Sequence, residues 1–373
     1  MWKIPLSKTF FDKREKEALI KQIDSDWVSM GETTVIFEEK IKEKLKIPHC
    51  LCVSNCTVAL HLACLVAGFG PGDEVIVPSL SFIATANAVL YTGATPVFAD
   101  IESIVLPVIS LKEIKQKFTN KTKGIIVVHY GGYQHNIFEI KKFAEKHSLK
   151  LIEDCAHSIG STVENQHLGT IGDIGCFSFF GNKNITTGEG GAIITHNKDI
   201  YEKLKTLRSH GMKSLSWDKF KGRHLNKDIE ILGYNYRFDD IRASIGLVQL
   251  GKLEHINSRR RALINQYINN LKDVSDFTIP FKDYPYLHSA HLFSIICADE
   301  KQKEKVVQAL KDNLIQTSHH YPPIHKYKLY EKYSYELPKT EMYSKLQVTL
   351  PLYPELKNVE VSYICDVMKE ALD

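Results

Sequence analysis

The stretch GCFSFFGNKNITTGEGGAIIT, residues 175–195, places one lysine, Lys183, in a loop rich in glycine and threonine between two apolar runs. Both runs, CFSFF and AIITH, are typical of strands, so the loop joins two strands at a sheet, where the lysine stem has little water around it. A desolvated lysine is shifted toward its neutral, nucleophilic amine, which is the form that makes a Schiff base with an aldehyde. We therefore expect Lys183 to take part in chemistry.

The sequence around this loop predicts an α/β fold. Between about residues 50 and 195, short β-rich runs alternate with helical stretches: CLCVS with TVALHLACLVAG, EVIVP with FIATANAVLYTG, GIIVVHY with IFEIKKFAEKHS, and then KLIED. This order is typical of a mostly parallel sheet between helices, which binds ligands at the carboxyl ends of its strands. A long helical region, 239–274, leads to a smaller α+β unit, so we predict a large domain over 1–250 and a small C-terminal domain over 251–373.

The composition favours a small-molecule partner. The 373 residues carry 48 Lys and Arg against 44 Asp and Glu, and a formal charge of +4 is too small to indicate nucleic acid or an anionic membrane as partner. The N-terminal stretch becomes charged before any apolar run long enough for a signal peptide, and no later run reaches membrane-spanning length, so we expect a cytoplasmic protein. The eight cysteines form no C-x-x-C pair and are predicted to be buried free thiols, with no metal site and no disulfide.

An aldehyde cofactor with this chemistry is pyridoxal 5′-phosphate, which needs a carboxylate for its ring nitrogen, a cradle for its phosphate and a face to hold its ring. Asp154 ends the apolar run LKLIED, at the carboxyl edge of the predicted sheet. The segment VSNCTVALHL predicts a strand that stops at Ser54 and a helix that begins near Thr57, where N–H groups and the helix dipole favour a dianion. Ser178 in FSFF could donate to that phosphate, and Phe82 could cover the ring. Each residue also has an ordinary interpretation, as a helix cap, a turn or a core side chain.

Longer motifs that contain these residues resemble the DegT/DnrJ/EryC1/StrS family of pyridoxal-phosphate-dependent nucleotide-sugar aminotransferases. They run almost from end to end of the chain: SNCTVALHLA, PSLSFIATANAVLYTGATPVFADI, LIEDCAHSIG, GCFSFFGNKNITTGEGG, LRSHGM, LGYNYRFDDIRASIGLVQL and HHYPPIH. Agreement at so many motifs in one order makes chance resemblance negligible. The resemblance implies the aspartate-aminotransferase type of fold, fold type I, with a large α/β domain and a smaller C-terminal α+β domain.

The resemblance also implies a role for each candidate residue. Lys183 would bind the cofactor, Asp154 would pair with its ring nitrogen, and Phe82 would stack on its ring. His157 stands where the family often has glutamine or histidine near the cofactor's phenolic oxygen. The phosphate would be held by residues at one helix start and one strand end: Asn55, Cys56, Thr57 and Ser178.

Two further motifs imply contacts beyond the chain's own cofactor. Asn235, in GYNYR, would reach the phosphate bound by the partner subunit, so the resemblance implies a homodimer with shared active sites. The loop HHYPPIH would lie beside the substrate pocket with His320 and His325, and its prolines favour an extended substrate loop over a metal site.

Three consecutive arginines, at 259–261, lie in a helical stretch and are predicted to form a solvated face.

One position departs from the family. Cys56 stands where the motif S-N-G-T usually has glycine. If the backbone there needs a positive φ angle or a close approach to phosphate, cysteine costs about 1 kcal/mol or more. We therefore expect either a relaxed turn at Cys56 or a slightly weakened affinity for phosphate.

The resemblance implies amino transfer from L-glutamate to a nucleotide-linked keto sugar. The motif F-G-N-K-x-I-T-T-G-E-G-G resembles members that aminate C4 of 4-keto-6-deoxy hexoses, such as perosamine synthases. Three alternatives stay open: amination at C3 of a 3-keto sugar, a sugar dehydratase of the same family, and a non-catalytic regulatory or binding protein on the same fold. A dehydratase would carry histidine in place of Lys183, and a non-catalytic protein would lose Lys183 or Asp154, so both residues favour the aminotransferase.

Overall fold

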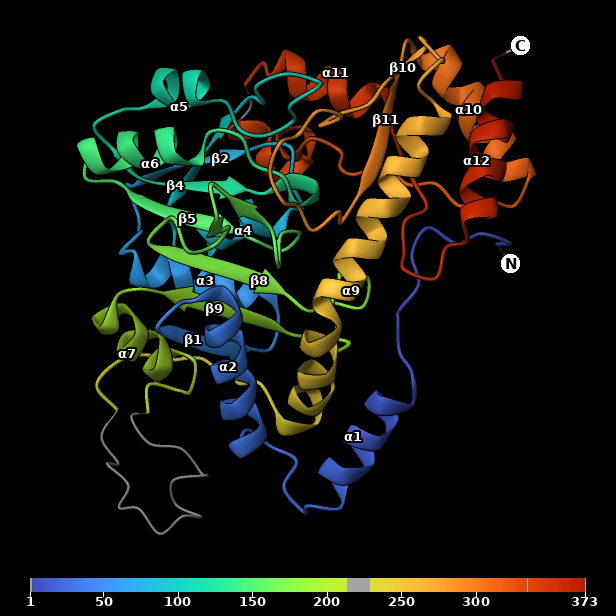
Figure 1. The fold of residues 1–373 in the computed structure, drawn as a ribbon. Helices are drawn as coiled ribbons and strands as arrows, with labels where there is room; N and C mark the ends of the chain where they lie inside the picture. Colours follow the sequence, from blue (N-terminus) through green and yellow to red (C-terminus); the bar gives the residue numbers. More distant parts are fainter. Residues whose placement is uncertain (1, 213–228, 334, 373) are drawn as a thin grey trace.

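The computed structural model describes residues 2–212, 229–333 and 335–372, and it is built around two main sheets (Figure 1). The larger sheet has the strand order β1-β9-β8-β5-β4-β2-β3, and every strand runs parallel to the others except β9, which is antiparallel to both neighbours. Its strands are β1 (His49–Val53), β2 (Glu74–Pro78), β3 (Thr95–Ala99), β4 (Thr122–Val128), β5 (Lys150–Asp154), β8 (Ile174–Ser178) and β9 (Gly191–Thr195). The predicted α/β fold with a mostly parallel sheet is confirmed.

Helices cover both faces of this sheet, because apolar residues point alternately to either side of each strand. In β1, Leu51 and Val53 pack against α3, whereas Cys50 and Cys52 pack on the other face, against α2. The first face carries α3 (Cys56–Val66), α4 (Ala84–Tyr91) and α7 (Lys198–Leu207). The second face carries α2 (Glu32–Leu45), α5 (Leu111–Lys117), α6 (Ile137–Lys146) and part of α9. A short hairpin, β6 (Thr162–Val163) and β7 (Gln166–His167), follows β5.

The smaller sheet is antiparallel and lies in the last third of the chain. Its order is β10-β11-β12, with β10 (Phe277–Thr278), β11 (Phe293–Cys297) and β12 (Gln347–Leu350). The accompanying helices are α10 (Glu300–Asp312), α11 (Pro338–Leu346), α12 (Asn358–Glu370) and two short 3₁₀ segments, η2 (Ile324–Lys326) and η3 (Lys328–Tyr333). The strands and helices of this region fall where the sequence predicts a smaller α+β unit.

The long helix α9 (Asp240–Asn270) connects the two sheets (Figure 1). Its first half packs against α2 and α1 (Lys13–Ile23), and its second half contributes Leu263 and Tyr267 to the core of the smaller sheet. Ile4, near the N-terminus, packs into that same core. Residue 250, the predicted domain boundary, lies inside α9, and the division into 1–250 and 251–373 stays a prediction.

The prediction of a solvated face at 259–261 is wrong. Arg260 is buried and donates to the carbonyl oxygens of Ala290 at 2.8 Å and His291 at 2.7 Å. Burial lowers the pKa of Arg260 to about 10. Both neighbouring arginines also donate to carbonyl oxygens beyond α9. The reason is that α9 packs this side against the smaller unit, so the guanidinium groups exchange water for backbone carbonyls.

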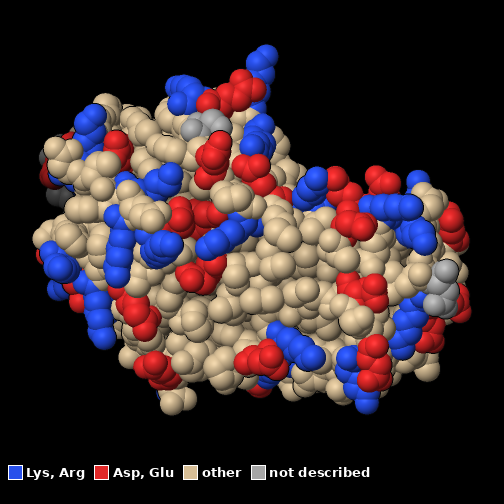
Figure 2. Space-filling view, turned by 90° about the horizontal axis from the view of Figure 1, so that it is seen from above, with Lys and Arg blue, Asp and Glu red and all other residues tan. Residues whose placement is uncertain are grey.

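The surface charges are mixed in sign, as the small net charge of the chain predicts, and the cysteine thiols are buried. On the described part of the face in Figure 2, Lys and Arg side chains alternate with Asp and Glu side chains. All eight cysteines are buried and free, as predicted. Among the residues that the structure describes, no helix combines the length and apolar character that a membrane crossing requires.

Candidate active site

A cavity of about 880 Å³ lies at the carboxyl ends of β5 and β8, beside the first residues of α3. This is the edge where parallel α/β sheets bind ligands. Its wall brings together most of the residues selected from the sequence: Asn55, Cys56, Thr57, Phe82, Asp154, His157, Ser178, Lys183 and His320. The structure does not bring Asn235 or His325 to this wall.

Lys183 lies in the loop between β8 and β9, where it is partly buried. Its amide donates to the carbonyl of Phe180 at 2.9 Å, which fixes a tight turn at the end of β8. Burial lowers the pKa of the Lys183 amine to about 8, against the opposing effect of Cys56 and Asp154. In the described part of the chain, this amine has no hydrogen-bond or ion-pair partner. Lys183 therefore presents an unpaired amine to the cavity.

Asp154 is the last residue of β5, and its side chain is buried. One carboxylate oxygen accepts from Thr85 Oγ1 at 2.7 Å, and the other accepts from the amide of Ala156 at 3.1 Å. Burial raises the pKa of this carboxyl, although the two hydrogen bonds oppose the rise. A carboxylate has about four acceptor positions, so Asp154 has capacity left for a further donor from the cavity.

The first turn of α3 offers backbone donors to the cavity. Asn55 caps the helix, and its side chain accepts from the amide of Val58 at 3.0 Å. The amides of Cys56 and Thr57 precede the first intrahelical bonds, and no described residue accepts from them. Together with the helix dipole, these free N–H groups favour an anion such as phosphate.

Two residues of the neighbouring strands complete this cradle. Ser178 ends β8, and its hydroxyl oxygen accepts from the amide of Phe180 at 3.4 Å, which leaves the hydroxyl proton for another acceptor. Gly191 begins β9 against the start of α3. A Cβ atom at Gly191 would lie 2.6–2.8 Å from backbone atoms of Asn55 and Cys56, so only glycine permits this close approach.

Cys56 adopts a relaxed conformation. It is the first residue of α3 and does not belong to the described residues with positive φ, so the strain considered for a non-glycine residue does not arise. Its side chain is buried, and burial raises the pKa of the thiol well above its usual value. A weaker affinity for phosphate at this position stays a prediction.

Three other selected residues share the wall with a tyrosine that sequence reasoning missed. Phe82 is 57% exposed, and its ring centroid lies 6.1 Å from that of Tyr321. Burial lowers the pKa of His320 to about 4 and that of His157 well below its usual value. The ring nitrogens of His157 lie 3.3 Å from the amide nitrogen of Gly131 and 3.1 Å from the hydroxyl oxygen of Tyr321. The predicted contact of His157 with the cofactor's phenolic oxygen stays a prediction. The signal for Tyr321 was its place directly after His320 in HHYPPIH.

Sequence reasoning also missed an aromatic part of the wall, formed by His61, Tyr91, Tyr234 and Tyr236. His61 Nδ1 lies 3.1 Å from the hydroxyl of Tyr236. Asn235 stands between the two tyrosines and is exposed. Because neighbours in an extended segment face opposite sides, Asn235 points away from the cavity that Tyr234 and Tyr236 face. The alternating pattern of GYNYR was the available signal.

His325 lies outside the cavity, in the packing between η2 and the larger sheet. Its Nδ1 lies 2.6 Å from Ser79 Oγ, and its Nε2 lies 3.1 Å from Glu341 Oε1. The imidazole is buried. The structure therefore separates His325 from the other selected residues.

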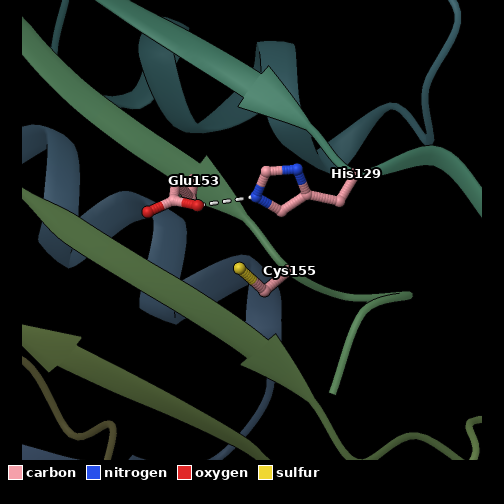
Figure 3. A group of neighbouring side chains, drawn as sticks. All are labelled: His129, Glu153 and Cys155. Carbon is pink, nitrogen blue, oxygen red and sulfur yellow. Dashed lines mark hydrogen bonds and ion pairs between the residues drawn. The ribbon is translucent and has the colours of Figure 1, made fainter. Parts of the chain in front are cut away.

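A second group of ionisable side chains lies next to Asp154: His129 at the end of β4, Glu153 and Cys155 (Figure 3). Glu153 accepts four hydrogen bonds of 2.6–2.8 Å, from the His129 imidazole and from three backbone amides: Gly169, Ile171 and Gly172. These donors fill the acceptor positions of the carboxylate without an ion. Burial raises the pKa of the Cys155 thiol well above its usual value, which disfavours a metal-binding thiolate. We interpret this cluster as structural.

The geometry of the cavity and nearly the whole length of the chain match one protein family. The model of the DegT/DnrJ/EryC1/StrS aminotransferase family matches residues 10–369. The chain belongs to this family. Its curated relatives include GDP-perosamine synthase of Escherichia coli O157:H7, 37% identical over 98% of both chains. They also include the spore coat polysaccharide biosynthesis protein SpsC of Bacillus subtilis (strain 168), 33% identical over 98% of this chain and 96% of its own.

Solved structures of this family's fold cover the same length. Helicobacter pylori PseC, an aminotransferase involved in the biosynthesis of pseudoaminic acid, matches with a TM-score of 0.92 at 29% identity, over 99% of this chain and 98% of its own. Spr1654 from Streptococcus pneumoniae, in its PLP form, matches with a TM-score of 0.91 at 27% identity, over 99% of this chain and 100% of its own. This member of the family is thus an aminotransferase of fold type I, and its cofactor is pyridoxal phosphate.

The groups in the cavity fit that cofactor. Lys183 offers an unpaired amine to an aldehyde, and Asp154 offers spare acceptor capacity to a ring nitrogen. The free amides at the start of α3 and the hydroxyl of Ser178 can donate hydrogen bonds to the oxygens of a phosphate. Each feature is unsatisfied within the described protein, and together they match the different parts of one molecule.

Proposed function

We propose that this aminotransferase moves an amino group from L-glutamate to C4 of a nucleotide-linked 4-keto-6-deoxy hexose. The observation that carries the proposal is the meeting of Lys183, Asp154 and the start of α3 in one cavity of about 880 Å³. A cavity of that size suits a substrate bound beside a cofactor. The relative named GDP-perosamine synthase and the motif F-G-N-K-x-I-T-T-G-E-G-G support a nucleotide-linked sugar and amination at C4.

Within this proposal, five side chains hold the cofactor. Lys183 would bind its aldehyde carbon with loss of water, Asp154 would pair with its ring nitrogen, and Phe82 would cover one face of its ring. Thr57 and Ser178 donate to its phosphate, together with the free amides of α3. When bound, pyridoxal phosphate supplies the electrophilic carbon that takes up the amino group and a ring that withdraws electrons from the amino donor.

Asp154 keeps the ring nitrogen protonated. Burial raises the pKa of this carboxyl when it stands alone, and a cationic N–H beside it stabilises the charged form. Thr85 and the amide of Ala156 hold the carboxylate in place. It can therefore accept the third hydrogen bond without rearrangement.

Lys183 moves a proton at its Nζ atom. Burial lowers the pKa of this amine to about 8, so a larger fraction of it is neutral at pH 7 than of an ordinary lysine. The neutral amine accepts the proton from Cα of the amino donor. Within that half of the reaction, the resulting ammonium would deliver the proton to the cofactor carbon that takes up the nitrogen. With the keto sugar the same transfer would run in reverse, so one residue serves both halves.

We also propose a cytoplasmic homodimer with shared active sites. Asn235 is exposed and faces away from its own chain's cavity, so it is free to donate to the phosphate bound by the partner subunit. The same segment carries exposed apolar side chains, Ile229 at 61% and Leu232 at 84%. Exposed apolar residues next to a polar donor are typical of a surface that a second subunit covers.

Subunit mixing tests the shared site. Asn235→Trp, which blocks phosphate binding, is combined with Lys183→Ala, each inactive alone, and the subunits are allowed to exchange. A heterodimer with shared sites places both defects in one site and leaves the other intact. When equal amounts of the two variants exchange at random, half of the dimers are heterodimers, so roughly a quarter of the wild-type activity returns. Absence of recovery after proven exchange overturns the shared site.

The reaction itself is tested with a panel of nucleotide-linked 3-keto and 4-keto sugars, pyridoxal phosphate and L-glutamate. Release of 2-oxoglutarate and formation of the amino sugar are measured together, with Lys183→Ala as the inactive control. We expect the highest kcat/KM with a 4-keto-6-deoxy hexose. A preference for 3-keto sugars overturns the assignment to C4, and absence of amination on every sugar overturns the proposed function.

A further inference from the structure

His157 has a defined proton position. Its Nδ1 accepts a hydrogen bond from the amide of Gly131 at 3.3 Å. Burial, reinforced by the positive charge of Lys183, lowers the pKa of His157 well below its usual value, so the ring is neutral and carries its one proton on Nε2. Nε2 lies 3.1 Å from the hydroxyl oxygen of Tyr321. His157 therefore donates to Tyr321.

The hydroxyl of Tyr321 is left with a proton to donate. Its oxygen accepts from His157, and no residue in the described ranges accepts its proton. Burial raises the pKa of Tyr321, so this proton stays on the oxygen. Tyr321 lines the cavity, with its ring next to that of Phe82. The hydroxyl is thus an oriented donor at the cavity wall.

Ring packing and hydrogen bonds connect His157 to the lysine loop. The ring of His291 lies 4.2 Å from that of His157, measured between centroids. His291 Nδ1 lies 2.8 Å from Oδ1 of Asn184, the residue directly after Lys183. The side-chain NH₂ group of Asn184 donates to Oδ1 of Asn257 in α9 at 2.7 Å and to the carbonyl oxygen of Ser289, before β11, at 2.6 Å. Because Asn184 and both histidines are buried, these contacts fix the hydroxyl of Tyr321 relative to the lysine loop.

We propose that Tyr321 donates a hydrogen bond to the carbonyl oxygen of the keto substrate, and that His157 is the positioning residue that orients this donor. The inference rests on the proposed function, because a keto substrate brings such an oxygen into the cavity. The hydrogen bond draws electron density from the carbonyl carbon, where the nitrogen becomes attached. The proton of Tyr321 stays on its own oxygen throughout. In the competing interpretation Tyr321 only packs beside Phe82, and the proton of its hydroxyl then has no hydrogen-bond acceptor among the described residues.

Tyr321→Phe removes the hydroxyl and keeps the ring. We expect kcat/KM for the keto sugar to fall about 10²-fold. The affinity for the amino-sugar product, which has no carbonyl oxygen, should change by less than about threefold. The matched control is Tyr330→Phe, since Tyr330 is a buried tyrosine outside the cavity whose hydroxyl donates to Asn87, and kcat/KM should be retained. A kcat/KM for Tyr321→Phe close to that of wild type overturns the proposal, as does an equal loss of product affinity.

Nitrogen-15 NMR of histidine-labelled protein, without substrate, tests the positioning role directly. We expect a neutral His157 with its proton on Nε2 at pH 7, assigned by comparison with His157→Gln. A proton on Nδ1, or a charged ring, overturns the role given to His157. This measurement does not depend on turnover, so its failure is distinguishable from that of the proposed function, which fails if the wild-type enzyme aminates no keto sugar.

A double-variant experiment separates action through Tyr321 from direct action. His157→Leu removes the donor to Tyr321, whereas His157→Gln keeps an N–H group that can take its place. If His157 acts through Tyr321, the glutamine variant retains most of the rate. The double variant Tyr321→Phe/His157→Leu is then no slower than the slower single variant. Additive losses overturn the positioning role.

Discussion

Glu153 and Asp154 are neighbours on β5, and both are buried carboxyl groups, yet their surroundings differ. Glu153 accepts four hydrogen bonds, which together outweigh its burial and hold its pKa below the ordinary value. Asp154 faces the cavity, accepts two, and has its pKa raised by burial. A carboxyl group whose hydrogen bonds are complete belongs to the scaffold. One with capacity left over, beside the unpaired amine of Lys183, belongs to a binding site.

The hydrogen bonds that fill the acceptor positions of Glu153 depend on a tight turn of the backbone at residues 169–172. Gly169 has a φ angle of +96°, a conformation that glycine adopts without strain. A Cβ atom there would lie 2.7 Å from the ring of Phe177 and 2.9 Å from Sγ of Cys155. Glycine therefore lets the turn approach β5 closely enough to aim its amides at Glu153.

The largest expected effect is the loss of turnover when Asp154, the carboxyl group that faces the cavity, is replaced. Asp154→Asn removes the charge at nearly constant shape, so the ring nitrogen of the bound cofactor is no longer held protonated. Turnover should fall on the order of 10³-fold or more. The urea midpoint of the cofactor-free protein should not fall, because burial already disfavours the charged carboxyl. Steady-state kinetics and urea denaturation check both statements, and a near-normal rate would remove Asp154 from the mechanism.

A smaller effect, of a different kind, is expected at Glu153. Glu153→Gln places an NH₂ group against donors that need an acceptor, so the free energy of unfolding should fall by about 3 kcal/mol. Turnover of the remaining folded protein should change by less than about tenfold. The same two measurements apply here. If Glu153→Gln lost turnover like Asp154→Asn while keeping its stability, the contrast between the two residues would be wrong.

The sequence could predict part of this contrast. Alternation along a strand indicates that Glu153 and Asp154 face opposite sides, and the end of the run LKLIED places Asp154 at the sheet edge. The Lys183 loop and the start of α3 were predictable for the same reason, since strand ends and helix starts are local patterns. The four donors to Glu153 were not, because three come from a turn whose approach depends on tertiary packing.

Residues brought in from distant segments were the harder part of the site. Tyr321 reaches the cavity from the last third of the chain, and no local pattern specifies which ring nitrogen of His157 it meets. Arg260 had the sequence appearance of a solvated charge, and it is buried because carbonyl groups of another segment replace its water. Such contacts follow from how α9 and the smaller sheet pack, which the sequence of either segment alone does not contain.

The smallest expected effect is the change with pH in the free energy of unfolding of the cofactor-free protein. The pKa of folded Asp154 lies above its ordinary value of 3.8, so its contribution to stability is complete below that pH and is lost as the pH rises through the folded pKa. The pKa of folded Glu153 lies below its ordinary value of 4.5, so its contribution is present above that pH and is lost as the pH falls through the folded pKa.

The two variants should therefore diverge from wild type in opposite directions. Asp154→Asn should gain stability relative to wild type as the pH rises above 3.8, and the deficit of Glu153→Gln should shrink as the pH falls below 4.5. The changes should amount to about 1 kcal/mol for each unit by which a pKa is shifted. Urea titrations across this pH range measure them, and parallel curves for both variants would show that the two carboxyl groups do not differ as described.

The most direct test of the cofactor site asks which residue becomes attached to pyridoxal phosphate. Protein loaded with the cofactor is reduced with borohydride, digested and analysed by mass spectrometry. We predict that the added mass lies on the peptide that contains Lys183, and that Lys183→Ala takes up no covalent label while it still binds the cofactor through Asp154 and the start of α3. A label on another lysine, or an unchanged label in Lys183→Ala, would contradict the account.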